Sequence, residues 1–122
     1  GALASTVAHD SQNIIAVGTD INSLCQAINA IIKKQGGIVV VDANQHSHLL
    51  ALPIAGLMSN EDGNNVAEQY KNLNQRTKQM GSTLRAPFMT LSFMALLVIP
   101  ELKLSDKGLF DGRKFDFTTL QV

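Results

Sequence analysis

The alternation of apolar and polar positions divides the chain into short segments that predict strands and helices in turn. Residues 13–19 (NIIAVGT) form a short apolar run, which predicts a buried strand. Residues 20–34 then carry apolar side chains at the three- and four-residue spacing of one helix face, which predicts an amphipathic helix. Thr19 or Asp20 can cap the start of this helix, and Gly36-Gly37 can stop it.

The following segments predict a hairpin and a second helix. Residues 38–52 begin with a β-branched apolar run, continue through polar turn residues at 42–45 and return to an apolar run, as a hairpin does. Because a strand and a helix precede this hairpin, we expect a crossover connection followed by an antiparallel partner. Ser59 with Asp62 resembles a capping box, and the apolar spacing after it predicts a helix that ends at Gly81.

The remaining segments are less regular. Residues 1–12 are small and polar, so we expect a loop or an edge segment there. Residues 86–99 are almost entirely apolar, and their periodicity does not separate helix from strand, although Pro87 favours a short helix. Residues 114–120 alternate like a final strand. The pattern as a whole predicts one α/β domain (mixed α+β) over residues 1–122, a small mixed sheet with two main helices packed on it.

Composition narrows the range of partners. Charged residues make up only 16% of the 122 residues, and ten basic side chains balance ten acidic ones. Such a chain has no field to attract nucleic acid or an anionic membrane, so we expect neither as a partner. A surface with few charges suits packing against another protein, although an independent, weakly charged domain is the alternative.

The single cysteine, Cys25, excludes a disulfide within the chain and a cysteine-rich zinc site, and it favours a cytoplasmic location. It falls on the apolar face predicted for residues 20–34, so we expect a buried, unreactive thiol. Three methionines near apolar loops could line a flat pocket, but filling the core is the more common use of this side chain. They are Met58, Met89 and Met94.

Two groups of polar residues could carry chemistry. His46 and His48 form an HxH pair, and in a strand both rings would point the same way and could reach one ion. The pair borders a predicted turn and has no further ligands downstream, so we expect a structural role, with an independent metal site as the alternative.

The second group consists of His9, Asp10, Ser11 and Asn13, just before the first predicted strand. An imidazole, a carboxylate, a hydroxyl and an amide so close together can hydrogen-bond a heterocycle or orient a neighbouring ligand. Ordinary turn and capping chemistry is the alternative. We expect neither a catalytic residue nor a metal ligand in this chain.

Five stretches, taken together and in order, resemble the C-terminal domain of bacterial and archaeal adenine deaminases of the amidohydrolase superfamily. They are VAHDSQNIIAVGT (7–19), GGIVVVD (36–42), LPIAGLMS (52–59), PFMTLSFMAL (87–96) and IPELKLSDKGLFD (99–111). The resemblance implies an upstream (β/α)₈ barrel that holds a two-metal centre of manganese or iron. There, a metal-activated water would attack C6 of adenine and release ammonia and hypoxanthine.

For this chain the resemblance implies a non-catalytic domain without a cofactor of its own, which packs on the barrel or covers its active site. A homo-oligomer is a further expectation. The family motif around the first strand usually reads H-D-S-H-N. His9, Asp10, Ser11 and Asn13 match it, whereas Gln12 replaces the second histidine and cannot serve there as an acid or base. The match makes the four matching residues candidates for substrate proximity. The alternative is a free-standing α/β module for small-molecule binding or oligomerisation.

Overall fold

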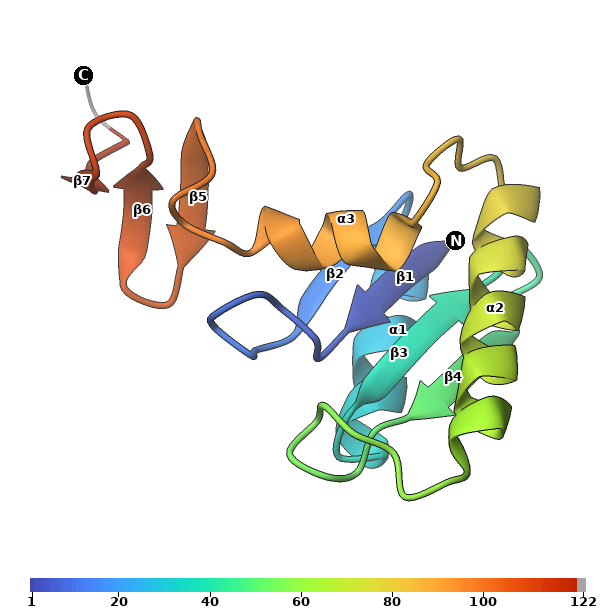
Figure 1. Ribbon diagram of the computed structural model, residues 1–122. Coiled ribbons are helices and arrows are strands. Elements are labelled where there is room, and N and C mark those ends of the chain that lie inside the picture. Colours follow the sequence, from blue (N-terminus) through green and yellow to red (C-terminus); the bar gives the residue numbers. More distant parts are fainter. Residues whose placement is uncertain (121–122) are drawn as a thin grey trace.

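The computed structural model describes residues 1–120, which form two sheets and three helices (Figure 1). The strands are β1 (Ala2–Ser5), β2 (Ile15–Gly18), β3 (Gly37–Val41), β4 (Ser47–Ala51), β5 (Leu102–Ser105), β6 (Gly108–Asp111) and β7 (Asp116–Thr118). The helices are α1 (Ile21–Lys33), α2 (Gly63–Gln79) and α3 (Pro87–Met94). The expected α/β class is confirmed. None of the helices in residues 1–120 is long and apolar enough to cross a membrane.

The larger sheet has the strand order β2-β1-β3-β4, and each pair of neighbours is antiparallel. β2 and β3 both run antiparallel to β1, so they are parallel to each other, and α1 forms the expected crossover between them. The sheet is therefore antiparallel throughout, where a mixed sheet had been expected, because β1 lies between the two parallel strands.

The first residues of the chain lie at the centre of this sheet, so the prediction of a loop or edge segment for residues 1–12 is wrong for β1 and confirmed for residues 6–12, which form a loop. β1 pairs with β2 on one side and with β3 on the other. Ala2 and Ala4 are buried beneath α1, where small side chains let the helix approach the sheet closely. Residues 13–19 do contain a strand, but it lies at the edge, and Val17 is 52% exposed rather than buried.

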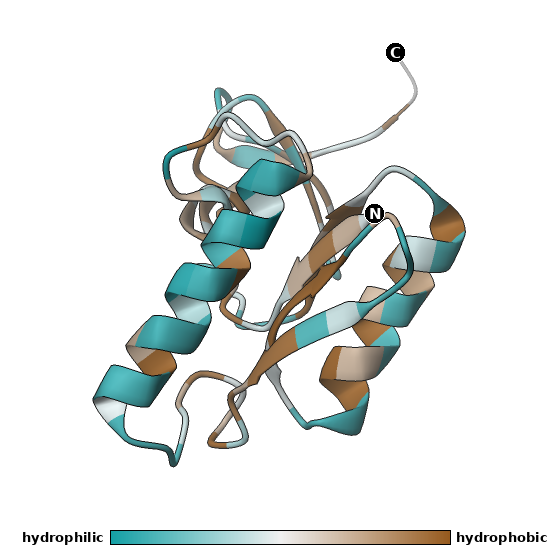
Figure 2. Ribbon diagram, turned by 90° about the vertical axis from the view of Figure 1, so that its right-hand side faces the viewer, coloured by the Kyte–Doolittle hydropathy of each residue, from teal (hydrophilic) through white to brown (hydrophobic). Residues whose placement is uncertain are grey.

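The main body has three layers, with α1 on one face of the sheet and α2 and α3 on the other (Figure 2). Val39 and Val41 point toward α1, whereas Ile38 and Val40 pack with side chains of α2 and α3. Because alternate residues of a strand face opposite sides, the apolar run of β3 is buried on both faces, as its composition predicts.

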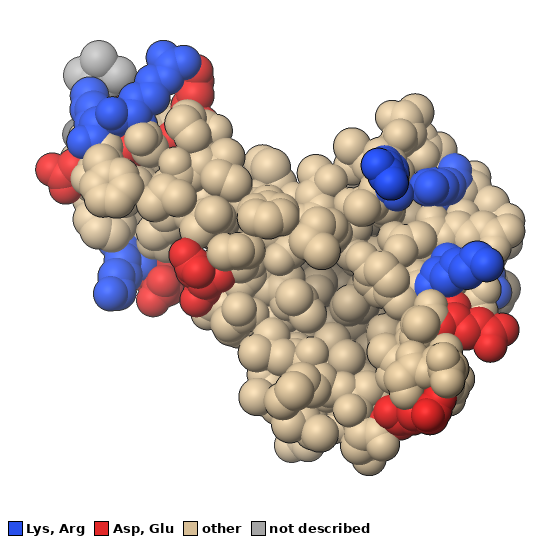
Figure 3. All heavy atoms as spheres, in the orientation of Figure 1, with Lys and Arg blue, Asp and Glu red and all other residues tan. Residues whose placement is uncertain are grey.

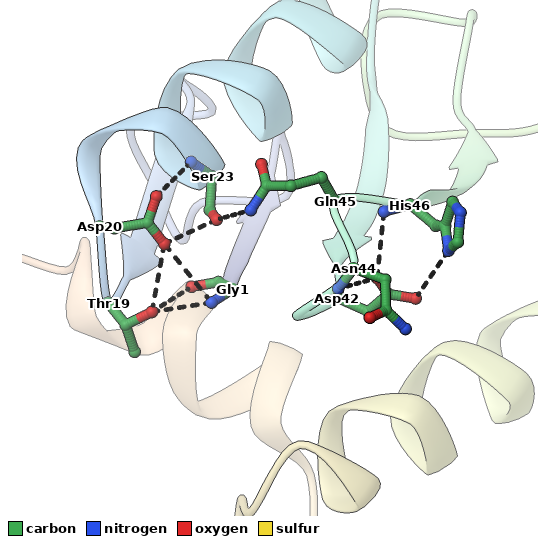
Figure 4. Close-up of polar contacts among 8 residues, drawn as sticks. All are labelled: Gly1, Thr19, Asp20, Ser23, Asp42, Asn44, Gln45 and His46. Atoms are coloured by element: carbon green, nitrogen blue, oxygen red, sulfur yellow. Dashed lines mark hydrogen bonds and ion pairs between the residues drawn. The ribbon is translucent and has the colours of Figure 1, made fainter.

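α1 has the predicted bounds, but only part of its predicted apolar face meets the sheet: Ile31 is buried and Leu24 packs against the core, whereas Ile21 and Ile32 are exposed. Its cap is Asp20, whose carboxylate accepts a hydrogen bond from the Ser23 backbone N–H at 2.8 Å (Figure 4). This bond is the main reason that the pKa of Asp20 lies below its ordinary value. The residues buried against the sheet are Ser23, Ala27 and Ile31. Cys25 is exposed, which corrects the expectation of a buried thiol.

The expected second helix and the short helix after Pro87 are both present as α2 and α3. The predicted capping box is not formed: Asp62 caps α2 by accepting from the Asn64 N–H, whereas Ser59 accepts from Glu61. The methionines do not fill the core, since the side chains of Met58, Met89 and Met94 are more than half exposed.

Strands β5, β6 and β7 form a small antiparallel sheet that projects from the end of α3, here called the arm (residues 102–118) (Figure 1). The final strand predicted at 114–120 is confirmed in shorter form as β7. The side chain at its centre is Phe110, whose ring meets those of Phe115 and Phe117 edge-on, with centroids 5.6 and 5.4 Å apart. Leu104 on the arm is 80% exposed. The arm thus has little core of its own.

Candidate functional site

The four predicted site residues lie in the loop between β1 and β2 (residues 6–14, here the β1–β2 loop). Ser5 is paired with both Ile15 and Ile38, so this loop lies at the end of the sheet where β3 begins. The side chains of residues 9–13 are all exposed. The sequence therefore brings the polar groups of this loop together on the surface of the molecule.

Contacts with α3 hold the β1–β2 loop in place. The His9 backbone N–H donates a hydrogen bond of 3.0 Å to the carbonyl oxygen of Ser92. The His9 ring stacks on Phe93, with centroids 4.9 Å apart and an angle of 23° between the planes. Ala8 is completely buried, and its carbonyl accepts a hydrogen bond of 2.8 Å from the Gln12 N–H. The loop is thus a tight turn anchored at one end.

Two residues of this turn, Asp10 and Gln12, have positive φ angles of 65° and 48°. Residues other than glycine rarely adopt this left-handed backbone conformation, although Asp tolerates it better than most. Backbone strain of this kind is held by surrounding contacts, and the contacts of His9 and Ala8 do so here. The conformation directs the side chains of residues 9–13 outward instead of into the core.

The His9 imidazole lies beside a carboxylate that is open to solvent. His9 Nδ1 is 3.3 Å from Asp10 Oδ1, and the two side chains are 44% and 74% exposed. His9 Nε2 and Asp10 Oδ2 make no hydrogen bond or ion pair within residues 1–120, so both can bind an external group. The pair thus offers an imidazole nitrogen that can donate or accept a hydrogen bond, next to a carboxylate oxygen that accepts one.

A hollow of about 340 Å³ separates the β1–β2 loop from the arm. Asp10 and Ser11 form its polar wall. The other wall is apolar and consists of Leu96, Leu97, Val98, Phe110 and Phe115. A polar wall opposite an aromatic and aliphatic wall can hold a flat heterocycle or a side chain of another protein segment.

Only two of the four predicted site residues therefore line the hollow. The structure places Asp10 and Ser11 in the hollow, His9 against α3, and Asn13 exposed outside the hollow lining. Sequence reasoning missed Phe93, which orients His9, and Phe115, which faces Asp10 across the hollow. Phe93 lies in the apolar stretch 86–99, where its spacing from other apolar residues gave no sign of a partner in the β1–β2 loop.

The HxH pair lies at the opposite end of the sheet, around the turn between β3 and β4. His46 lies in the turn just before β4 and His48 lies in the strand, and both rings lie near one carboxylate oxygen: His48 Nε2 and His46 Nδ1 are 3.2 and 3.7 Å from Asp42 Oδ2. Asp42 also accepts hydrogen bonds from the backbone N–H groups of Asn44 and His46, which fixes the turn (Figure 4). These hydrogen bonds hold the pKa of Asp42 below its ordinary value, and the bond from the His46 backbone N–H contributes most to the shift.

No group of three or more His, Cys, Asp or Glu side chains within residues 1–120 is arranged to hold a metal ion. His9 is separated from the other two histidines by the length of the sheet, because Ser5 and Ile38 pair near it whereas Ala2 and Val41 pair near Asp42. The described side chains therefore do not fit a two-metal centre.

Charged side chains are unevenly distributed over the surface. Figure 3 shows Lys, Arg, Asp and Glu gathered over the arm and over α2, with a broad uncharged area between them on the side that carries α3. An uncharged surface can be covered by another protein surface without desolvating ions, which is the costly step in burial.

Comparison with known proteins gives a consistent result. The family described as the adenine deaminase C-terminal domain matches residues 1–116. An adenine deaminase of Sulfurovum sp. (strain NBC37-1) is 59% identical over 118 residues, which make up 96% of this chain and 22% of that protein. One of Methanosarcina acetivorans is 54% identical over 122 residues, 98% of this chain and 22% of that protein. One of Escherichia coli O9:H4 is 46% identical over 122 residues, 100% of this chain and 21% of that protein.

The chain thus spans about a fifth of the length of these relatives. Both the β1–β2 loop and nearly all of the arm fall inside the region that matches the family. The similarity therefore covers every feature of the candidate site described above.

Proposed function

The chain belongs to the adenine deaminase C-terminal domain family, and from this premise we propose that it is the non-catalytic C-terminal domain of an enzyme that hydrolyses adenine to hypoxanthine and ammonia. The proposal is supported by relatives named adenine deaminase that are 46–59% identical over nearly the whole chain. It is also supported by the length of those relatives, which leaves about four-fifths of each protein for other domains.

We assign the reaction to an amidohydrolase barrel outside this chain. A two-metal centre of manganese or iron would supply a hydroxide nucleophile there, by lowering the pKa of bound water. The side chains of residues 1–120 do not fit such a centre, so no step of the reaction is assigned to them. The exposed free thiol of Cys25 favours a reducing compartment, and we place the enzyme in the cytoplasm.

The role of this domain is to pack on the barrel and cover its active site. The observation that carries this role is the β1–β2 loop, in which a strained, anchored turn presents His9, Asp10 and Ser11 to the outside. An anchored loop loses little conformational entropy on docking, and its polar groups can complete the hydrogen bonds of a bound purine or of a neighbouring metal ligand. Excluding water from the active site is the expected gain in catalysis.

The test is His9→Ala in the complete gene product. Truncation removes both the stacking on Phe93 and the exposed nitrogen, so we expect turnover of adenine to fall by about 10- to 100-fold. The content of bound metal should stay unchanged, because this domain supplies no ligand. His9→Phe keeps an aromatic ring against Phe93 but lacks the nitrogen, and we expect it to remain impaired.

The matched control is His46→Ala, since this side chain is 71% exposed and lies at the other end of the sheet. It should leave turnover at the level of the unaltered enzyme. Equal turnover in the His9→Ala and His46→Ala enzymes would remove the assigned role of the β1–β2 loop.

A further inference from the structure

The outer face of α1 carries a row of apolar side chains, most of them exposed, that the rest of residues 1–120 does not fully cover. Ile21 is 77% exposed, Ile32 is 58% exposed, and Cys25 lies exposed between them. Ile28, half-buried, completes the row. We call these four residues the α1 stripe. Single exposed apolar side chains are common, but an aligned row along a helix marks a surface that another molecule covers.

The spacing within the α1 stripe is that of a helix–helix seam. Steps of four, three and four residues separate Ile21, Cys25, Ile28 and Ile32. Two helices pack along such a seam, each inserting its side chains between those of the other. The exposed residues beside the stripe, Asn22 and Asn29, are uncharged, so two such helices would not repel each other.

The charges at the ends of α1 complement each other when two copies are antiparallel. Asp20 lies at the start of the helix, and Lys33 and Lys34 lie exposed at its end. No ion pair to either lysine occurs within the described part of the chain. In an antiparallel pair, the acidic end of each helix meets the basic end of the other, and the helix dipoles also oppose.

We propose that the α1 stripe is the contact between two copies of this chain, in which the α1 helices pack antiparallel across a two-fold axis. An interface of this kind is self-complementary: Ile21 of one copy meets Ile32 of the other, and Cys25 meets Ile28. The axis passes close to the middle of the stripe, so the two Cys25 side chains approach each other.

The position of the α1 stripe argues against the barrel as its occupant, and here the inference rests on the proposed function. The β1–β2 loop, through its contacts with α3, belongs to the face of the sheet opposite α1. α1 lies on the other face of the sheet (Figure 2), so a barrel docked on that loop would leave α1 free. A membrane surface is disfavoured because the stripe has no aromatic residue and the chain has no net charge.

The experiment compares dissociation constants of the dimer of the complete gene product. Ile21→Glu/Ile32→Glu places carboxylates on two exposed positions of the stripe, and we expect the dissociation constant, measured by analytical ultracentrifugation, to rise at least about 30-fold. The matched control, Asn72→Glu/Gln79→Glu, adds the same charge to the exposed face of α2 and should leave it unchanged. Circular dichroism of both variants confirms that they are folded.

Crosslinking tests the orientation of the helices. A short bismaleimide should join Cys25 to Cys25 between two copies, detected as a linked peptide by mass spectrometry, and Cys25→Ser should abolish the product. Each of three results would overturn the proposal: the complete protein is a monomer, the dissociation constant is unchanged in Ile21→Glu/Ile32→Glu, or Cys25 does not react with maleimide in the monomer. Adenine hydrolysis is measured on the same samples: its absence from the unaltered protein would overturn the proposed function while leaving the dimer result to stand.

Discussion

At the scale of single residues, Gly36 lies just before β3, where the backbone of Leu52 and of Gly56 approaches it closely. Its φ is 133°, and an added Cβ would lie 2.5 Å from both the Leu52 carbonyl oxygen and the Gly56 Cα. Gly36→Ala should therefore lower the free energy of unfolding by about 2 kcal/mol or more, because strain and a clash with backbone act together. Urea denaturation measures the change.

The matched control is Gly63→Ala at the start of α2, where no atom lies within 4 Å of an added Cβ. Alanine favours the helix at that position, so we expect stability to stay the same or rise by up to about 1 kcal/mol. A loss of stability in Gly63→Ala as large as that in Gly36→Ala would contradict the role assigned to the close approach at Gly36.

The ionisation of Asp42 should make the stability of the fold depend on pH. Hydrogen bonds, first from the His46 N–H and then from the His48 ring, lower its pKa from the ordinary value of 3.8. A carboxyl with a lowered folded pKa stabilises the fold above its unfolded pKa, and this contribution is lost as the pH falls through the folded value.

We therefore expect Asp42→Asn to have a lower urea midpoint than the unaltered protein at neutral pH, with the difference shrinking below pH 3.8. Asp106→Asn, in the exposed turn between β5 and β6, controls for the loss of one charge. A difference between Asp42→Asn and the unaltered protein that grows on acidification would contradict this assignment.

At the scale of elements, the sequence predicted helix bounds well and buried faces poorly. The bounds of α1 follow from Asp20 and from the apolar spacing, both of which are local signals. Its buried face followed only in part, because Ser23 and Ala27 pack against the sheet together with Ile31, while Ile21 and Ile32 stay outside. β1 itself was missed because Ala2 and Ala4 lack the β-branched side chains that mark a strand, and only pairing in three dimensions shows them to be central.

The arm gives a prediction at this scale. It has almost no core besides Phe110, and a three-stranded sheet needs an apolar face to be stable. Phe110→Ala removes an interaction of about 3–5 kcal/mol, more than the arm can lose. Amide hydrogen exchange should become fast in residues 102–118 while β3 stays protected.

Leu104→Ala is the control, because this side chain is 80% exposed on the same sheet and should leave exchange in the arm unchanged. If β3 lost its protection together with the arm in Phe110→Ala, the arm would not be the separate unit that its position indicates.

At the scale of the whole molecule, the site could be foreseen only in part. The polar density of residues 9–13 and the resemblance pointed to the β1–β2 loop, and the structure places all of these side chains on the surface. The hollow beside Asp10 could not be foreseen, because its apolar wall comes from residues about 85 to 105 positions downstream, and no pattern within the chain links them. The placement of the β1–β2 loop and α1 on opposite faces, on which the proposed covering role depends, likewise emerges only from the three layers.

The central claim is that this chain is a covering domain whose partner performs the hydrolysis, and an activity measurement tests it most directly. The complete gene product and residues 1–122 alone are each incubated with adenine and manganese or iron, and hypoxanthine and ammonia are measured. The account predicts that the complete product forms both and that residues 1–122 form neither. Metal-dependent conversion of adenine by residues 1–122 alone, or no conversion by the complete product, would contradict it.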